Sequence, residues 1–314
     1  MMLKAFIIIL IFIGLGTSLT IWRADRNAQQ VEADYPPEGD FVTIGDRSIH
    51  YLVQGDGPDL ILIHGASGST RDFTYAMAPA LAEHYRVIAF DRPGFGYSDR
   101  AQGFSIAEQA ALLADAADQI GVQAPLIVGQ SYGGAVALAW ALARDDTAGL
   151  VLISAASNPW TTGIGAYYTA LSSRAGQAIM APLLSAWVPE GAINAALAAV
   201  FAPNDVPDGY GAHIGTRMSL RLDTMRENAL QRRALLGEIT DQVTRYRDLS
   251  IPVEILHGTA DTIVPVQTHS EPLASQLPNA ELTLLEGIGH MPHHVALDDV
   301  LAAIDRAAMR AGLR

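Results

Sequence analysis

The sequence predicts an α/β fold: a doubly wound, mostly parallel sheet of eight strands with an inserted helical segment. Short apolar runs alternate with segments of helical apolar spacing over most of the chain, which is typical of a parallel sheet covered by helices. The alternation stops between residues 158 and 250, where Ala, Leu, Met and aromatic residues recur at helical spacing. A Gly-x-Ser-x-Gly sequence at residues 129–133 joins an apolar run to a helical run, so a serine is expected on a tight strand-to-helix turn.

The first predicted strands fit a hairpin, and parallel strands follow. Residues 45–48 (Gly-Asp-Arg-Ser) separate the first two strands. The strands are expected at residues 41–44, 49–53, 60–63, 86–90, 125–128, 150–154, 252–257 and 282–285. Helices are expected at residues 71–84, 105–120, 135–140 and from 298 onward. Ser105 and Glu108 form a capping-box pattern, and Asp298 and Asp299 provide an acidic start to the last helix.

These patterns also set the domain boundaries. Residues 41–157 and 251–314 are expected to form the α/β core, and residues 158–250 the helical lid. Residues 27–40 are polar and acidic, and Tyr-Pro-Pro-Glu-Gly within them breaks regular structure, so we expect a linker there.

Residues 1–26 are predicted to be an N-terminal transmembrane anchor or signal segment. The uncharged stretch from Ala5 to Trp22 spans about 27 Å as a helix, which nearly matches a bilayer core. We expect an uncleaved single-pass anchor; the alternative is a cleaved signal that leaves a secreted or periplasmic protein. Lys4 precedes the apolar run and Arg23 and Arg26 follow it, which slightly favours a cytoplasmic catalytic domain.

The composition excludes several classes of function. The 314-residue chain has a net charge of −13, with 20 Lys and Arg against 33 Asp and Glu. Nucleic-acid binding is not expected, because phosphate contacts need clustered basic residues. The chain has no cysteine, so disulfides, a thiolate nucleophile and a zinc–thiolate site are excluded.

The turn at residues 129–133 has the pattern of a nucleophile elbow. Its glycines allow strand and helix to approach closely, and the strained turn raises the Ser131 hydroxyl above the sheet edge. A serine hydroxyl is a weak nucleophile until a base takes its proton and a third group orients that base. Asp261 and His290 lie on the loops after the last two predicted strands. We therefore expect Ser131, Asp261 and His290 to meet at one sheet edge as nucleophile, acid and base.

A further loop at this edge is expected to stabilise a developing oxyanion. His64-Gly65-Ala66 follows the strand at residues 60–63 and offers unobstructed backbone N–H groups. The amides of Ala66 and Tyr132 are the predicted oxyanion hole.

From about Phe41 to the C-terminus, the chain resembles the α/β-hydrolase superfamily. The motifs that carry this resemblance are His64-Gly65, Asp91-Arg92-Pro93-Gly94-Phe95-Gly96-Tyr97-Ser98, the elbow, His257-Gly258 with Asp261, and Gly289-His290. Five motifs in the family's order and at its usual spacings are specific together. The resemblance implies the order Ser, Asp, His and a helical lid after the sixth strand. The similar subgroup contains esterases, carbon–carbon bond hydrolases, haloalkane dehalogenases and epoxide hydrolases.

The serine at position 131 narrows the chemistry within that subgroup. Dehalogenases and epoxide hydrolases use a carboxylate that attacks a saturated carbon, whereas an alkoxide performs acyl transfer at a carbonyl. Meta-cleavage carbon–carbon hydrolases are expected to have a tryptophan after the base histidine, but Met291 follows His290 here. The predicted function is a serine hydrolase that cleaves a carboxylic ester of a hydrophobic small molecule through an acyl-enzyme. A carbon–carbon hydrolase and a non-catalytic ligand-binding member of the fold are the alternatives.

The apolar lid favours a hydrophobic acyl or alkyl substrate. Candidate pocket-lining residues are Trp160, Tyr167, Tyr168, Trp187 and Met291. For the lid residues the alternative interpretation is packing within the lid.

No metal or organic cofactor is predicted. His293 and His294 are interpreted as polar loop residues at the edge of the site, because no ligand spacing supports a metal. Asp91 is interpreted as the organiser of a turn, and His64 and His257 as turn residues at strand ends rather than as the base.

Overall fold

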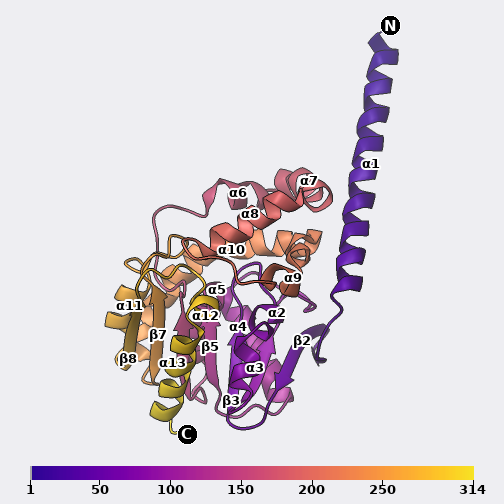
Figure 1. The fold of residues 1–314 in the computed structure, drawn as a ribbon. Helices are drawn as coiled ribbons and strands as arrows, with labels where there is room; N and C mark the ends of the chain where they lie inside the picture. Colours follow the sequence, from indigo (N-terminus) through magenta and orange to yellow (C-terminus); the bar gives the residue numbers. More distant parts are fainter. Residues whose placement is uncertain (1) are drawn as a thin grey trace.

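The computed structural model describes residues 2–314 and contains an eight-stranded sheet with helices on both faces (Figure 1). The strands lie in the order β1-β2-β4-β3-β5-β6-β7-β8. They are β1 (Asp40–Ile44), β2 (Arg47–Gln54), β3 (Asp59–Ile63), β4 (Arg86–Phe90), β5 (Leu126–Gln130), β6 (Gly149–Ile153), β7 (Val253–Gly258) and β8 (Ala280–Leu285). The β1–β2 and β2–β4 pairs are antiparallel and all other pairs are parallel, which confirms the predicted fold class.

Each face of the sheet packs against its own apolar core. Along β3, Ile61 and Ile63 belong to the core beneath α4 (Ile106–Gln119) and α5 (Tyr132–Ala143), whereas Leu60 and Leu62 belong to the opposite core. The second core is covered by α3 (Met77–Leu81) and by α13 (Leu297–Arg310), which packs on β6 and β7. The short helix α11 (Ser270–Gln276) lies beside β8. Burying each such Leu or Ile side chain stabilises the fold by roughly 1.5–3 kcal/mol.

The local signals at two helix starts are confirmed. Ser105 accepts a hydrogen bond from the Glu108 amide, and the Glu108 side chain accepts from the Ser105 amide, so α4 begins with a capping box. Asp298 and Asp299 lie in the first turn of α13. The hairpin turn is tighter than predicted, because Ile44 pairs with Arg47.

The helix expected at residues 71–84 is instead two short helices, α2 (Thr70–Thr74) and α3. Ala76 has φ −148° and ψ −42°, which breaks the helix between them. Pro79 explains the break, because it has no N–H for the carbonyl four residues earlier and its ring would collide with that carbonyl.

The N-terminal helix α1 (Met2–Asp34) is longer than predicted. The stretch expected as a linker, residues 27–40, is helical up to Asp34 and irregular only beyond it. Ala, Gln and Glu dominate this stretch and favour helix, and Pro36 and Pro37 then prevent its continuation.

The inner end of α1 contacts the lid, while its N-terminal part projects away from the body (Figure 1). Arg23 Nε donates to the Ala186 carbonyl at 2.8 Å, and Asn27 Nδ2 donates to the Ser185 carbonyl at 2.9 Å. Ala24 and Val31 are buried by this contact. The helix is long and apolar enough to cross a membrane, a property that signal sequences share.

A helical insertion lies between β6 and β7, as the sequence predicts, and covers the sheet edge at the carboxyl ends of the parallel strands (Figure 1). Its elements are α6 (Gly165–Leu171), η1 (Gly176–Met180), α7 (Ala181–Trp187), α8 (Glu190–Phe201), α9 (Tyr210–Ile214), η2 (Thr216–Leu220), α10 (Leu222–Gln242) and η3 (Val243–Asp248). We refer to residues 158–250 as the lid. Two small apolar clusters form where lid helices pack on one another and on the loop after His290.

Candidate active site

Ser131 lies at the junction of β5 and α5 in a strained backbone conformation. Its φ is +52° and its ψ is −115°, a region that residues other than glycine rarely adopt. The Ser131 amide donates to the Ile153 carbonyl at 2.9 Å. Its carbonyl accepts from the amides of Gly134 and Ala156 at 3.0 and 3.1 Å. Bonds to the neighbouring strand end and the following helix therefore hold the turn in place.

The glycines of the turn are required by close backbone contacts. A Cβ atom on Gly129 would lie 2.5 Å from the Gly133 carbonyl oxygen, and one on Gly133 would lie 2.1 Å from the Ile63 carbonyl oxygen. Both distances are far below van der Waals contact. The elbow is consequently packed against the end of β3, the strand that leads to the His64-Gly65-Ala66 loop.

The three predicted side chains meet at the carboxyl ends of the parallel strands. His290 Nε2 lies 2.9 Å from Ser131 Oγ, and His290 Nδ1 lies 2.7 Å from Asp261 Oδ2. An ionised carboxylate only accepts hydrogen bonds, so Nδ1 carries the proton in this pair. In the neutral imidazole Nε2 is then the acceptor for the Ser131 hydroxyl. All three residues are buried.

Asp261 is held as a carboxylate by several donors. Its Oδ1 accepts from the amides of Ile263 and Val264 at 2.8 and 2.9 Å. Burial alone would raise the pKa of Asp261, but hydrogen bonds from His257 and His290 lower it well below the ordinary value. The carboxylate therefore stays charged and keeps the imidazole of His290 oriented.

His257 lies beside Asp261 and is not available as a base. Its Nε2 donates to the Val264 carbonyl at 2.7 Å and lies 3.2 Å from Asp261 Oδ2, while Nδ1 lies 2.6 Å from Ser270 Oγ. Both ring nitrogens are thus engaged, in agreement with the interpretation of His257 as a turn residue.

The loop after β3 contacts the elbow and leaves two amides free. A Cβ on Gly65 would lie 3.2 Å from Ser131 Cβ and 2.2 Å from Gln130 Oε1, so a larger residue would require the Gln130 side chain and the elbow to shift. Within residues 2–314, neither the Ala66 nor the Tyr132 amide donates to a protein acceptor. The Tyr132 ring is buried and its hydroxyl accepts from Gln109 Nε2 at 3.1 Å, so the side chain packs in the core.

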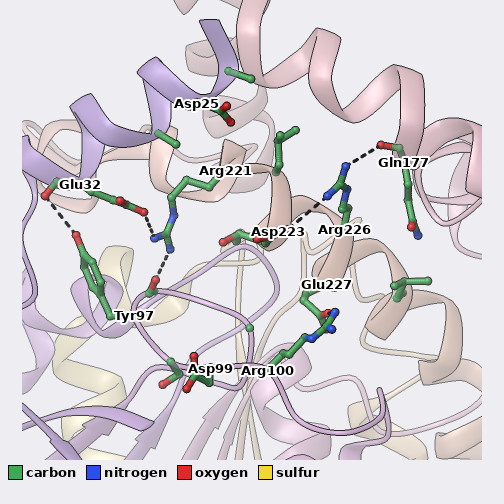
Figure 2. Close-up of a pocket in the computed structure, with 18 of the residues that line it drawn as sticks. Asp25, Glu32, Tyr97, Asp99, Arg100, Gln177, Arg221, Asp223, Arg226 and Glu227 are labelled. Carbon is green, nitrogen blue, oxygen red and sulfur yellow. Dashed lines mark hydrogen bonds and ion pairs between the residues drawn. The ribbon is translucent and has the colours of Figure 1, made fainter. Parts of the chain in front are cut away.

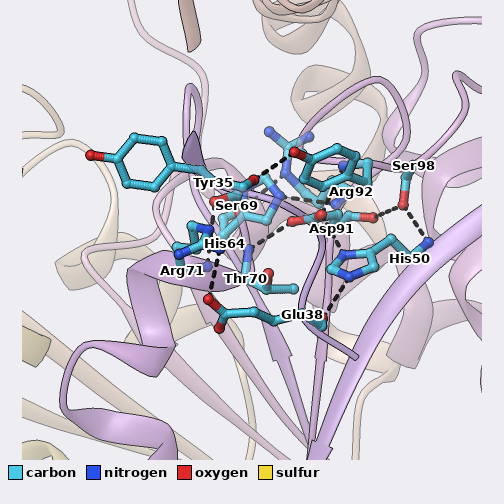
Figure 3. Close-up of polar contacts among 12 residues, drawn as sticks. Tyr35, Glu38, His50, His64, Ser69, Thr70, Arg71, Asp91, Arg92 and Ser98 are labelled. Carbon is cyan, nitrogen blue, oxygen red and sulfur yellow. Dashed lines mark hydrogen bonds and ion pairs between the residues drawn. The ribbon is translucent and has the colours of Figure 1, made fainter. Parts of the chain in front are cut away.

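His64 and Arg92 brace this loop from the inside (Figure 3). His64 Nδ1 donates to the Gly65 carbonyl at 2.8 Å, and Nε2 accepts from the Arg92 amide at 2.9 Å. Arg92 Nη2 also donates to the Gly65 carbonyl at 3.1 Å. Burial and the Arg92 charge lower the pKa of His64 to about 4, so the ring is neutral and occupied. This agrees with a structural role.

Asp91 organises the adjoining turn, as interpreted from the sequence (Figure 3). Its carboxylate accepts from the amides of Thr70 and Tyr97 at 2.7 and 2.9 Å and from His50 Nδ1 at 2.6 Å. A Cβ on Gly96 would overlap this carboxylate, which explains the glycine there.

The side chains of His293 and His294 are buried in a polar cluster, and the two residues lie on a short helix rather than in the predicted loop. They lie on α12 (Pro292–Val295), and their Nε2 atoms contact the two oxygens of Asp72 at 3.2 and 2.8 Å. The Tyr210 hydroxyl of the lid donates to Asp72 at 2.6 Å. No local pattern signals this cluster, because Asp72 lies more than 200 positions from the histidines.

The ligand atoms of Asp72, His293 and His294 lie within 4.8 Å of one another, a composition that could hold a metal ion. The fit is poor, however. Histidine ligands normally donate their second ring N–H to a partner, and both Nδ1 atoms are buried here without a partner in the described part of the chain. The cluster is better described as a hydrogen-bonded junction between α2, α12 and the lid.

The candidate pocket residues occupy different surroundings. Met291 is buried and its Sδ lies 3.8 Å from Gln130 Nε2, beside the elbow. Trp160 donates from Nε1 to the Gly163 carbonyl at 2.8 Å, and its ring lies near His269. Tyr167 and Tyr168 pack edge to face within the lid. Trp187 lies against α1, where it contacts Thr20 and Arg23.

A cavity of about 1150 Å³ lies between α1, η1, α10 and the loop after β4 (Figure 2). Its walls carry both acidic and basic side chains, among them Glu32, Arg221, Arg226 and Glu227. Ser131 and His290 do not line it. Its α10 wall nevertheless adjoins the site, because Asn228 Nδ2 donates to Ser67 Oγ at 2.7 Å, immediately after Ala66.

Comparisons with known proteins agree with this geometry. The sequence profile described as "Alpha/beta hydrolase family" matches residues 60–303. This chain belongs to the alpha/beta hydrolase family.

The relatives of this chain include hydrolases of several kinds. The 2-hydroxymuconate semialdehyde hydrolase of Pseudomonas putida is 31% identical, covering 76% of this chain and 82% of the relative. Haloalkane dehalogenase 2 of Mycobacterium tuberculosis is 29% identical, covering 86% of this chain and 94% of the relative. Among solved structures, the esterase RhEst1 from Rhodococcus sp. ECU1013 superposes with a TM-score of 0.66 at 26% identity, covering 85% and 98% of the two chains. Membership of the family supports a hydrolase.

Proposed function

We propose that this hydrolase cleaves carboxylic esters of hydrophobic small molecules through a serine acyl-enzyme. The observation that carries the proposal is the hydrogen-bonded series Ser131–His290–Asp261, with donor–acceptor distances of 2.9 and 2.7 Å. Groups within hydrogen-bond reach can transfer a proton without rearrangement.

The proposed reaction uses each of these groups in turn. His290 Nε2 accepts the hydroxyl proton as Ser131 Oγ attacks the carbonyl carbon, and Asp261 stabilises the resulting imidazolium. The amides of Ala66 and Tyr132 donate to the oxyanion. His290 then protonates the leaving alcohol. It later takes a proton from the water that attacks the acyl carbon, and it returns this proton to Ser131 Oγ as the bond between Oγ and the acyl carbon breaks.

The nucleophile separates this proposal from the dehalogenase chemistry of one relative. Attack on a saturated carbon needs a carboxylate that can form an ester intermediate, and a serine occupies the elbow here. Carbon–carbon bond cleavage is the second candidate, because the 2-hydroxymuconate semialdehyde hydrolase is a relative at 31% identity. Met291, in the position after the base, favours the ester.

A fluorophosphonate probe tests the proposal directly, because it reacts only with an activated serine. The intact protein should be labelled, and Ser131→Ala should not. Ser131→Gly is a second variant without the hydroxyl. Glycine accepts the positive φ, so this variant should fold without strain, and its loss of labelling cannot be due to misfolding. Hydrolysis of p-nitrophenyl esters should fall by about 10⁵–10⁶-fold in both variants.

A substrate panel then separates the two hydrolase chemistries. Esters of increasing acyl length are compared with a vinylogous diketone of the meta-cleavage type. Turnover of the diketone without turnover of any ester would replace the proposal with the carbon–carbon hydrolase. An unlabelled native protein that turns over neither substrate would favour a ligand-binding member of the fold.

A further inference from the structure

The lid exposes an apolar face beside α1. Ile179, Leu183 and Trp187 are 62%, 48% and 45% exposed, although all three are large and apolar. They recur every four residues along η1 and α7, and the buried side of α7 is formed by other residues. We call these three residues the 179–187 face. Exposed apolar surface of this kind marks an interaction site.

The end of this face is attached to α1. Trp187 Nε1 donates to Thr20 Oγ1 at 3.2 Å, and the Arg23 guanidinium lies 4.3 Å from the centre of the Trp187 ring. Arg23 also donates to the Ala186 carbonyl. These contacts fix the position of α7 along the length of α1 (Figure 1).

That position coincides with the end of the apolar part of α1. Residues 2–22 extend about 30 Å as a helix, which equals the thickness of a bilayer core. The most apolar 18-residue window of α1 has a mean hydropathy of 2.3 and is 0% buried. If this part spans the bilayer, then Thr20 and Trp187 lie at the boundary between hydrocarbon and headgroups. Tryptophan prefers this boundary, and an arginine beside it reaches the headgroups.

We propose that the 179–187 face lies in the interfacial layer of the bilayer that α1 spans, so that the lid is seated on the membrane surface. The proposal rests on α1 being an uncleaved anchor. The two helical segments at residues 176–187 and 190–201, which are bent by 103° relative to one another, together have the length and composition of a membrane span, so this side of the lid is unusually apolar. Lipid is favoured over a second copy of the chain, because Trp187 at the end of the face contacts α1 at Thr20, where the apolar part of that helix ends.

The absence of cysteine allows this proposal to be tested by single-site labelling of the full chain. Ile179→Cys and Leu183→Cys carry an environment-sensitive fluorophore in phosphatidylcholine nanodiscs. Met309→Cys is the matched control, because Met309 is 58% exposed and lies on α13. Quenching by doxyl groups on the lipid acyl chains is compared with quenching by iodide in water. We expect doxyl quenching to be several-fold stronger at 179 and 183 than at 309, and iodide quenching to be several-fold weaker.

Three results would overturn the proposal. One is equal iodide access at all three positions, which would mean that the face is in water. Another is protection from iodide without doxyl quenching, which would mean that a second copy covers the face. The third is an intact mass showing that the chain in the membrane fraction has lost α1. Fluorophosphonate labelling of the same samples tests Ser131 separately. If the serine is not labelled, the quenching data still show whether the 179–187 face lies in lipid.

Discussion

Gln130 and His290 are joined by a hydrogen bond from the Gln130 side-chain amide to the His290 carbonyl, at 3.3 Å. The residue before the nucleophile thereby holds the loop that carries the base. The same amide approaches Met291 Sδ. Gln130 is buried, and its Oε1 occupies the space that a Cβ atom on Gly65 would need.

Replacing Gln130 by leucine should therefore slow the reaction without removing a reacting group. A hydrogen bond of this kind contributes about 0.5–1.5 kcal/mol, so kcat for a p-nitrophenyl ester should fall by about 2- to 10-fold while KM changes little. Gln123→Leu, at an exposed position, is the control. An unchanged kcat, or a loss that only follows a lower Tm, would contradict this positioning role.

Asp261→Asn should reduce kcat far more strongly. The amide would no longer favour the His290 tautomer with the proton on Nδ1, and such a change costs about 10⁴-fold in serine hydrolases with this arrangement. Asp223→Asn is the matched control, because the Asp223 side chain is 96% exposed. Kinetics with one ester would measure both variants. Equal rates for the two would show that Asp261 does not orient the base.

Gly65→Ala should damage the site by collision alone. The new methyl group would lie 2.2 Å from Gln130 Oε1 and 3.2 Å from Ser131 Cβ, so the Gln130 side chain must leave its position and the elbow must shift slightly. We expect a loss of at least about 10²-fold in kcat, the usual effect of displacing an oxyanion donor.

Gly237→Ala is the control, because it makes the same substitution at a position that has room for the methyl group. Gly237 lies in α10, and a Cβ atom added to it would meet no other atom within 4 Å. Alanine should therefore stabilise this helix by about 0.5–1 kcal/mol. Thermal unfolding and ester kinetics of both variants check the pair. Full activity in Gly65→Ala would refute the close packing of loop and elbow.

His293 should make stability depend on pH. Burial and the charge of His294 lower the pKa of His293 to about 4 from an ordinary 6.5. Between these values the unfolded chain binds a proton that the folded chain does not, so stability falls as the pH drops through this range. Asp72 acts in the same direction but at lower pH, because its pKa lies well below 3.8 in the folded state and its contribution is lost only in stronger acid.

Urea unfolding at pH 7 and pH 5 measures this effect. The decrease in the free energy of unfolding from pH 7 to pH 5 should be smaller in His293→Gln than in the wild type by about 1–2 kcal/mol. His84→Gln, at an exposed position, should leave the loss unchanged. Identical losses in His293→Gln and the wild type would mean that His293 is protonated equally in both states.

The strands and the meeting of Ser131, Asp261 and His290 could be predicted because they follow from local patterns and one topological rule. Apolar runs mark the strands, and parallel strands bring the loops after them to a single edge. Each of the three residues directly follows such a run or lies a few positions beyond it. No long-range contact had to be known in advance.

The Asp72 cluster could not be predicted for the opposite reason. Its members come from α2, α9 and α12, and nothing in the sequence near Asp72 distinguishes a buried carboxylate from an exposed one. Likewise, the polar stretch after Asn27 carries no local sign that it packs on the lid. Its helix is stabilised by tertiary contacts such as the ion pair between Arg221 and Glu32, whose charged atoms lie 2.8 Å apart.

The continuous course of α1 to Asp34 also limits how the enzyme can search for substrate. A flexible tether would let the catalytic domain tumble and sample molecules at any height above a membrane. A helix whose end is bonded to the lid holds the domain at one height and one tilt. If α1 spans a bilayer, diffusion of the enzyme is reduced to two dimensions, and the serine stays at one fixed level relative to the membrane.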